Sequence, residues 1–202
     1  SPTSPAGRSL IEPASRPEPD SDGNYRDAPA GIPNVEADWR QIKPELIEIF
    51  LEAGQRSAWP VYIWGKPGRG KTSAAAAAFR RWPHGRPSWL RLGEWIRLVQ
   101  DCKADGPQRF GGSGRPYHAD HYWRTRVQEP TLLIVDDVGV RSATEPQREI
   151  ITELIDRRGT RPTIYTSNHG IKELGEVYDG RIASRLLRGI PVELTGADRR
   201  LE

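Results

Sequence analysis

The stretch Gly65-Lys66-Pro67-Gly68-Arg69-Gly70-Lys71-Thr72 decides the fold of this chain. It fits G-x-x-x-x-G-K-[ST], the pattern of a phosphate-binding loop. The apolar residues 59–64 before it predict a buried strand, and the alanine-rich residues 72–79 after it predict a helix. A strand, a glycine loop and a helix in this order are the context in which the pattern binds phosphate. A chance glycine-rich turn is the alternative, and the two flanks argue against it.

The loop offers several groups to a nucleotide. Its glycines let backbone N–H groups turn towards phosphate oxygens, and the helix start adds unpaired N–H groups and the positive end of a dipole. Lys71 is expected to reach the β- and γ-phosphates, and the Thr72 hydroxyl to bind Mg²⁺. The predicted nucleotide-binding residues are Gly65, Lys66, Pro67, Gly68, Arg69, Gly70, Lys71, Thr72 and Ser73.

A second group of candidate residues follows the apolar run 132–135, which predicts a buried parallel strand. Asp136 and Asp137 stand at its carboxyl end, where open α/β sheets bind their ligands. We expect Asp136 to hold Mg²⁺, through water, and Asp137 to act as general base towards an attacking water. Two aspartates that cap the next turn are the alternative. Asn168 ends the predicted strand 162–168, where it can orient water, although in isolation an asparagine that opens a turn is the simpler interpretation.

The bulk composition indicates one domain and a tail. The chain has 202 residues with a mean hydropathy of −0.68, and residues 1–30 are rich in Pro, Ser, Asp, Glu and Gly, which predicts a disordered tail or linker before a domain at 31–202. A single cysteine and the lack of a transmembrane or signal segment favour a cytoplasmic protein without a membrane partner. Because the chain begins at Ser1 and contains no methionine, we expect a fragment or a processed form of a longer protein.

The remaining periodicities complete an α/β pattern. Strands are predicted at 59–64, 88–92, 132–137, 162–168 and 191–194, and helices at about 36–51, 72–79, 94–102, 118–128, 145–158 and 179–188, with a loop at 104–116. Strands that alternate with helices predict a five-stranded parallel sheet with helices on both faces. The phosphate loop, the two aspartates and Asn168 then meet at one edge, which is typical of a Mg²⁺-dependent P-loop NTPase.

Three segments resemble one protein family. Ile134-Val135-Asp136-Asp137-Val138-Gly139, the Thr-Ser-Asn ending of residues 162–168, and Gly180-Arg181-Ile182-Ala183-Ser184-Arg185-Leu186 are similar to the DnaC/DnaI/IstB branch of the AAA+ ATPases. The family comprises bacterial and phage helicase loaders and transposition helper ATPases. The likeness runs from about Ala30 to the end of the chain.

The resemblance implies an ATPase whose sites are shared between subunits. Asn168 matches the sensor asparagine, Arg185 the arginine finger and Arg181 a basic neighbour, although a solvated basic helix face is the alternative for the arginines. A homo-oligomer with ATP at its subunit interfaces, active only when assembled, is implied. The chain departs from the family in two respects: only a low-complexity tail precedes the ATPase domain, and little room is left for a C-terminal helical lid, so we expect the lid to be reduced or absent.

The partners implied by the resemblance are DNA, expected to be single-stranded, and a replicative helicase or a transposase. Residues 80–126 carry ten Lys and Arg against four Asp and Glu, which suits a phosphate backbone, although on charge alone an ordinary solvated surface is the favoured interpretation. We favour a helicase loader acting in DNA replication. The alternatives are a transposition helper whose ATP state controls DNA binding and target choice, and a small-molecule phosphotransferase, for which no second substrate pocket is recognisable.

Overall fold

The computed structural model describes residues 44–80, 82, 84–110, 115–139, 143–178 and 180–196. The predicted tail at 1–30, the domain boundary at 31 and the first part of the predicted helix at 36–43 lie outside the described residues. So do residues 111–114 of the glycine-rich loop. No helix in the part of the chain that is described is both long and apolar enough to cross a membrane.

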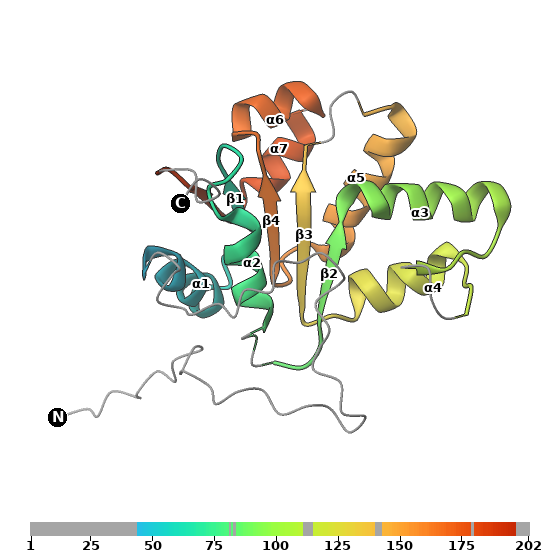
Figure 1. Ribbon diagram of the computed structural model, residues 1–202, viewed down its shortest axis with the longest axis horizontal. Coiled ribbons are helices and arrows are strands. Elements are labelled where there is room, and N and C mark those ends of the chain that lie inside the picture. Colours follow the sequence, from blue (N-terminus) through green and yellow to red (C-terminus); the bar gives the residue numbers. More distant parts are fainter. Residues whose placement is uncertain are drawn as a thin grey trace.

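A five-stranded parallel sheet forms the centre of the molecule (Figure 1). The strands lie in the order β2-β3-β4-β1-β5, so the strand that leads into the phosphate loop has β4 and β5 as neighbours. This arrangement confirms the predicted fold class. The bounds of the strands are β1 Val61–Trp64, β2 Pro87–Arg91, β3 Leu132–Val138, β4 Thr163–Ser167 and β5 Ile190–Glu193.

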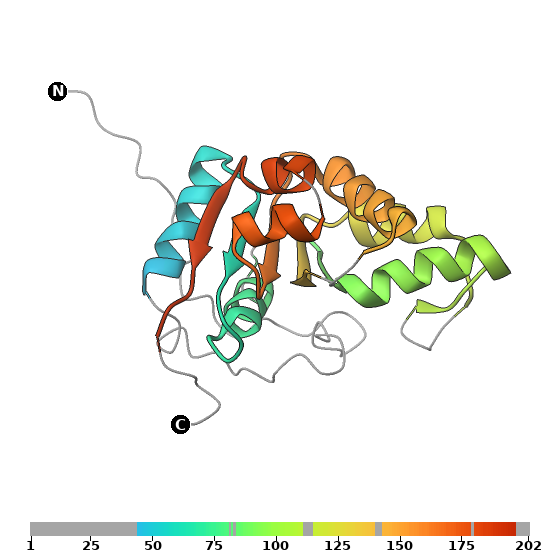
Figure 2. The same ribbon diagram turned by 90° about the horizontal axis from the view of Figure 1, so that it is seen from above.

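Helices cover both faces of this sheet, with α2 on one side and α5 on the other (Figure 2). Beyond β2, α3 and α4 lie together at the far end of the molecule (Figures 1 and 2). The bounds are α1 Pro44–Arg56, α2 Lys71–Arg80, α3 Leu92–Asp105, α4 Ala119–Tyr122, the π-helical η3 Trp123–Gln128, α5 Glu145–Arg158, α6 Ile171–Val177 and α7 Gly180–Leu186.

Alternate residues of β1, β2, β3 and β4 enter two separate cores, as the pleat of a strand requires. Val61 and Ile63 of β1 pack on the side of α1 and α2, whereas Tyr62 between them packs on the side of α3, α5 and α6. Five consecutive alanines of α2, residues 74–78, are all buried. Their small side chains let α2 lie close against the sheet. This packing fixes the position of the first turn of α2 relative to the end of β1.

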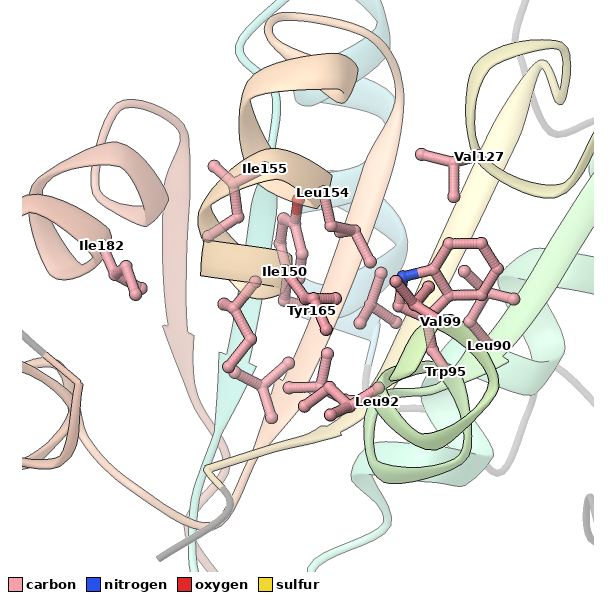
Figure 3. Packing of buried hydrophobic residues seen from close by; sticks show 14 of the residues in the cluster. Leu90, Leu92, Trp95, Val99, Val127, Ile150, Leu154, Ile155, Tyr165 and Ile182 are labelled. Carbon is pink, nitrogen blue, oxygen red and sulfur yellow. The ribbon is translucent and has the colours of Figure 1, made fainter. Parts of the chain in front are cut away.

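The larger core surrounds Trp95 and Tyr165, as Figure 3 shows. Trp95 is fully buried and meets Trp123 of η3 edge to face, with 4.8 Å between the ring centroids. Aliphatic residues of α5, which include Ile150 and Leu154, belong to the same core and lie near Tyr165 (Figure 3). This core anchors α3, η3 and α5 to one face of the sheet.

A buried arginine stabilises the end of the sheet at which β3 and β4 begin. Arg158, the last residue of α5, is 2% exposed and donates hydrogen bonds to the carbonyl oxygens of Val127, Pro130 and Pro162 and to the Thr163 hydroxyl. Burial lowers the pKa of its guanidinium to about 10, so the group remains charged at neutral pH. The charge therefore joins the ends of η3 and α5 to the beginnings of β3 and β4.

Several predicted boundaries differ from the structure. Leu92, predicted as strand, is the first residue of α3, which continues to Asp105 into the predicted loop. The predicted helix 118–128 is a short α-helix followed by a π-helix. Strand β3 extends to Val138 and does not end at the two aspartates. Helix α6 was not predicted; its seven residues begin after Gly170, whose backbone N–H is capped by the Glu173 carboxylate.

Candidate nucleotide-binding site

The phosphate loop joins β1 to α2 at the carboxyl edge of the sheet, as predicted. Gly70 has a φ of 83°, a conformation that favours glycine. At Gly65 a Cβ atom would lie 2.4 Å from the carbonyl oxygen of Leu194, so the approach of the chain after β5 admits no side chain there. Glycine at positions 65 and 70 therefore permits the close approach and the backbone conformation on which the shape of the loop depends.

Lys71 lies folded over this loop. Its Nζ donates hydrogen bonds to the carbonyl oxygens of Gly65, at 2.8 Å, and Lys66, at 2.9 Å. The side chain is largely buried, and its ammonium group therefore lies within the curve of the loop. Arg69 contributes a second cation, whose Nη1 is buried without a hydrogen-bond partner in the part of the chain that the structure describes. The loop concentrates positive charge where phosphate oxygens are expected.

Asp136 lies on β3, which β4 separates from β1, the strand that leads into the phosphate loop. The Thr72 hydroxyl at the start of α2 donates a hydrogen bond to Asp136 Oδ1 over 3.2 Å. Burial raises the pKa of this carboxyl, while hydrogen bonds from Thr166 and Thr72 act in the opposite direction. The structure therefore brings together the two predicted Mg²⁺-binding residues. Hydroxyl and carboxylate oxygens are ligands that suit Mg²⁺, so this pair fits the predicted metal.

Asp137 lies beside Asp136 but points differently. It is exposed, and its φ of 62° is in the left-handed region, which aspartate tolerates better than most residues. The pairing of β3 with β4 is irregular between Val135 and Val138, which marks a β-bulge at the two aspartates. The bulge and the left-handed conformation thus occur at the two adjacent residues that present one buried and one exposed carboxylate.

Thr166 of β4 is a site residue that the sequence reasoning missed. Its hydroxyl donates a hydrogen bond to Asp136 Oδ1 and accepts one from the Asp137 backbone N–H, at 2.5 and 3.1 Å. Asn168, the predicted sensor, is exposed just beyond the end of β4. Among the described residues, Thr166 is thus the side chain of β4 that forms a hydrogen bond with Asp136. The role of Asn168 stays a prediction. A threonine within a buried strand was the available signal.

The predicted arginines lie on α7. Arg185 Nε forms an ion pair with Asp156 Oδ1 of α5 at 2.7 Å, and both side chains are partly exposed. Arg181, one turn earlier, is exposed. The structure therefore places Arg185 against Asp156 of its own chain. Its predicted role at the ATP of a neighbouring subunit stays a prediction.

Comparisons with known proteins show what the chain resembles in sequence and in fold. No family model matches the chain. The replicative helicase loader DnaC of Escherichia coli K12 is 28% identical over 129 residues, which cover 62% of this chain and 49% of DnaC. A crystal structure of the DnaC helicase loader superposes with a TM-score of 0.62, at 18% identity, over 75% of this chain and 88% of that one. The chain has a DnaC-like AAA+ fold.

Two further structures support the same fold. DnaI matches with a TM-score of 0.54 and 20% identity, over 76% of this chain and 84% of that one. DnaA from Aquifex aeolicus, bound to AMPPCP, matches with a TM-score of 0.59 and 18% identity, over 84% of this chain and 53% of that one. These likenesses confirm the predicted resemblance to DnaC and DnaI. The chain spans about half the length of the curated DnaC relatives that it matches.

Proposed function

We propose that this DnaC-like chain binds and hydrolyses ATP with Mg²⁺ and loads a replicative helicase onto single-stranded DNA. The observation that carries the proposal is the hydrogen bond between Thr72 of the phosphate loop and Asp136 of β3, with Asp137 beside them. The similarity to the helicase loader DnaC supports the choice of process, and the similarity in fold to DnaA bound to the ATP analogue AMPPCP supports the choice of nucleotide.

In this proposal the residues of one subunit bind the nucleotide and polarise water. Lys71 exchanges the carbonyl oxygens of Gly65 and Lys66 for phosphate oxygens, and Thr72 and Asp136 would hold the metal. Bound Mg²⁺ would neutralise the charge that develops on the transferred phosphoryl group. Asp137 accepts a proton from the attacking water, because its carboxylate is exposed next to the metal-binding pair. Asn168, at the same edge, orients that water.

A second subunit completes the site. Arg185 supplies a cation to the γ-phosphate of its neighbour, with Arg181 beside it, so that turnover requires a homo-oligomer. To do so Arg185 must exchange its present partner, Asp156 at 2.7 Å, for phosphate oxygens. Such an exchange replaces one anion by another and keeps the guanidinium paired, which limits the free energy that assembly must supply.

The proposed DNA partner is single-stranded, and the excess of basic residues at 80–126 supports a contact with its phosphate backbone. A helicase is the proposed protein partner. A transposition helper of the IstB type remains the other outcome of the test below.

The test is the rate of ATP hydrolysis against protein concentration, measured without DNA, with single strands and with duplex, and with Lys71→Ala as the inactive control. A rate that rises more than linearly and further with single strands, together with transfer of a replicative helicase onto single strands, is expected. Stimulation by duplex alone would replace the loader by the transposition helper. A linear rate that DNA does not change would refute the proposed assembly.

A further inference from the structure

Thr166 links the two aspartates of β3 through a single hydroxyl. The side chain is 1% exposed, and its Oγ1 both donates to Asp136 Oδ1 and accepts from the Asp137 N–H. A hydroxyl can donate and accept through the same oxygen atom in this way. Valine has the same shape without either capacity, and serine keeps both.

The β-bulge makes this link necessary. Val135 pairs with Tyr165 and Val138 pairs with Ser167, so two residues of β3 face the single Thr166 of β4. A bulge removes backbone groups from the regular ladder. The Thr166 hydroxyl accepts the displaced N–H of Asp137 in place of a backbone carbonyl. It thereby satisfies a donor that would otherwise be left without a partner between two strands.

The same hydroxyl also restrains the orientation of the Asp136 carboxylate. Thr72 and Thr166 approach Oδ1 from α2 and β4, at 3.2 and 2.5 Å. With both bonds made to Oδ1, rotation of the carboxylate is restricted and Oδ2 keeps one direction. Without the Thr166 hydroxyl, only the longer hydrogen bond, from Thr72, would hold the carboxylate.

We propose that Thr166 is a positioning residue for Mg²⁺, which fixes Asp136 towards the phosphate loop and holds Asp137 in its outward, left-handed conformation. The proposal rests on the proposed nucleotide function. It separates Thr166 from the predicted sensor Asn168, since Thr166 acts through the two aspartates and not on substrate. Loss of such a supporting hydrogen bond to a metal ligand typically weakens metal binding by about 10-fold to 100-fold.

The test compares Thr166→Val and Thr166→Ser by titration with a fluorescent ATP analogue at increasing Mg²⁺ concentration and in EDTA. Thr166→Val is expected to bind the nucleotide in EDTA as the unaltered protein does, and to need at least about 10-fold more Mg²⁺ for half of the metal-dependent gain in affinity. Thr166→Ser is expected to stay within about twofold of the unaltered protein, because its hydroxyl is retained.

Thr163→Val is the matched control. Thr163 lies on the same strand, is equally buried and donates its hydroxyl hydrogen bond to the Arg161 carbonyl, at the far end of β4. This variant is expected to lose thermal stability without any change in the Mg²⁺ midpoint. An unchanged midpoint in Thr166→Val, or an equal shift in Thr163→Val, would overturn the positioning role.

The readout is binding, so it does not depend on hydrolysis. If the unaltered protein binds the analogue with Mg²⁺ but hydrolyses no ATP, the loader proposal fails and the role of Thr166 is still decided by the midpoints. Absence of Mg²⁺-dependent binding in the unaltered protein would overturn both.

Discussion

Replacement of Arg158 by methionine, which has a similar unbranched stem and no charge, tests the buried network at the amino-terminal edge of the sheet. Four hydrogen bonds are lost, to Val127, Pro130, Pro162 and Thr163. Bonds made by a charged donor contribute about 1.5 kcal/mol each at the lower end of their range, or about 6 kcal/mol here.

The cost of burying the charge offsets part of this gain. Burial lowers the pKa of the guanidinium from 12.5 to about 10, which corresponds to about 3 kcal/mol. The net stabilisation is therefore about 3 kcal/mol. We expect Arg158→Met to lower the free energy of unfolding by this amount in urea denaturation. Nucleotide binding at saturation should persist, because the phosphate loop lies at the other edge of the sheet.

The neighbouring Arg157 provides the control. It pairs with Glu153 at 2.6 Å on the partly exposed side of α5, and Arg157→Met is expected to cost less than about 1 kcal/mol. If the two variants are equally stable, or if Arg158→Met is more stable than the unaltered protein, desolvation outweighs the hydrogen bonds and the reasoning is refuted.

Three further predictions concern the nucleotide site. Asp137→Asn should bind ATP normally and hydrolyse it at least about 100-fold more slowly in a phosphate-release assay, and full turnover would exclude the general-base role. Arg185→Ala should keep nucleotide affinity and lose the concentration-dependent part of turnover, whereas equal specific activity of the unaltered protein at low and high concentration would argue against a role in trans. Because burial raises the pKa of the Asp136 carboxyl, its contribution to stability is present at low pH and is lost as the pH rises through the folded-state pKa. Without ligand at pH 7, Asp136→Asn should therefore melt at a higher temperature than the unaltered protein, and the difference should shrink towards pH 4. The same variant should bind Mg²⁺ poorly. A lower melting temperature of Asp136→Asn at pH 7 would contradict the expected cost of the buried charge.

The fold and the phosphate loop could be predicted because their signals are local. Alternation of apolar strands with helices is visible within short windows, and the loop motif with its two flanks occupies consecutive residues. Thr72, Asp136 and Asp137 were accordingly placed at the correct edge of the sheet from the sequence.

The features that were missed depend on contacts between distant segments. The bulge at Asp136 and Asp137 arises only when β3 pairs with β4, so a threonine in a buried strand could be noticed in the sequence, but its hydrogen bonds to the two aspartates could not be predicted. The ion pair of Arg185 with Asp156 requires α7 to pack on α5. Helix α6 contains a glycine and has only seven residues, so its intrinsic propensity is weak and its cap and the burial of Leu174 stabilise it.

The strand order has a consequence for fragments of this protein. Val61 of β1 pairs with Ile164 of β4 and with Ile190 of β5, which both follow it far along the chain. During synthesis, the strand that carries the phosphate loop is therefore complete long before either of its neighbours exists. A chain cut between β3 and β4 would contain the whole loop and both aspartates, yet β1 would have no strand to pair with and Asp136 would lack Thr166. Nucleotide binding should thus appear abruptly, only when the last two strands have joined the sheet.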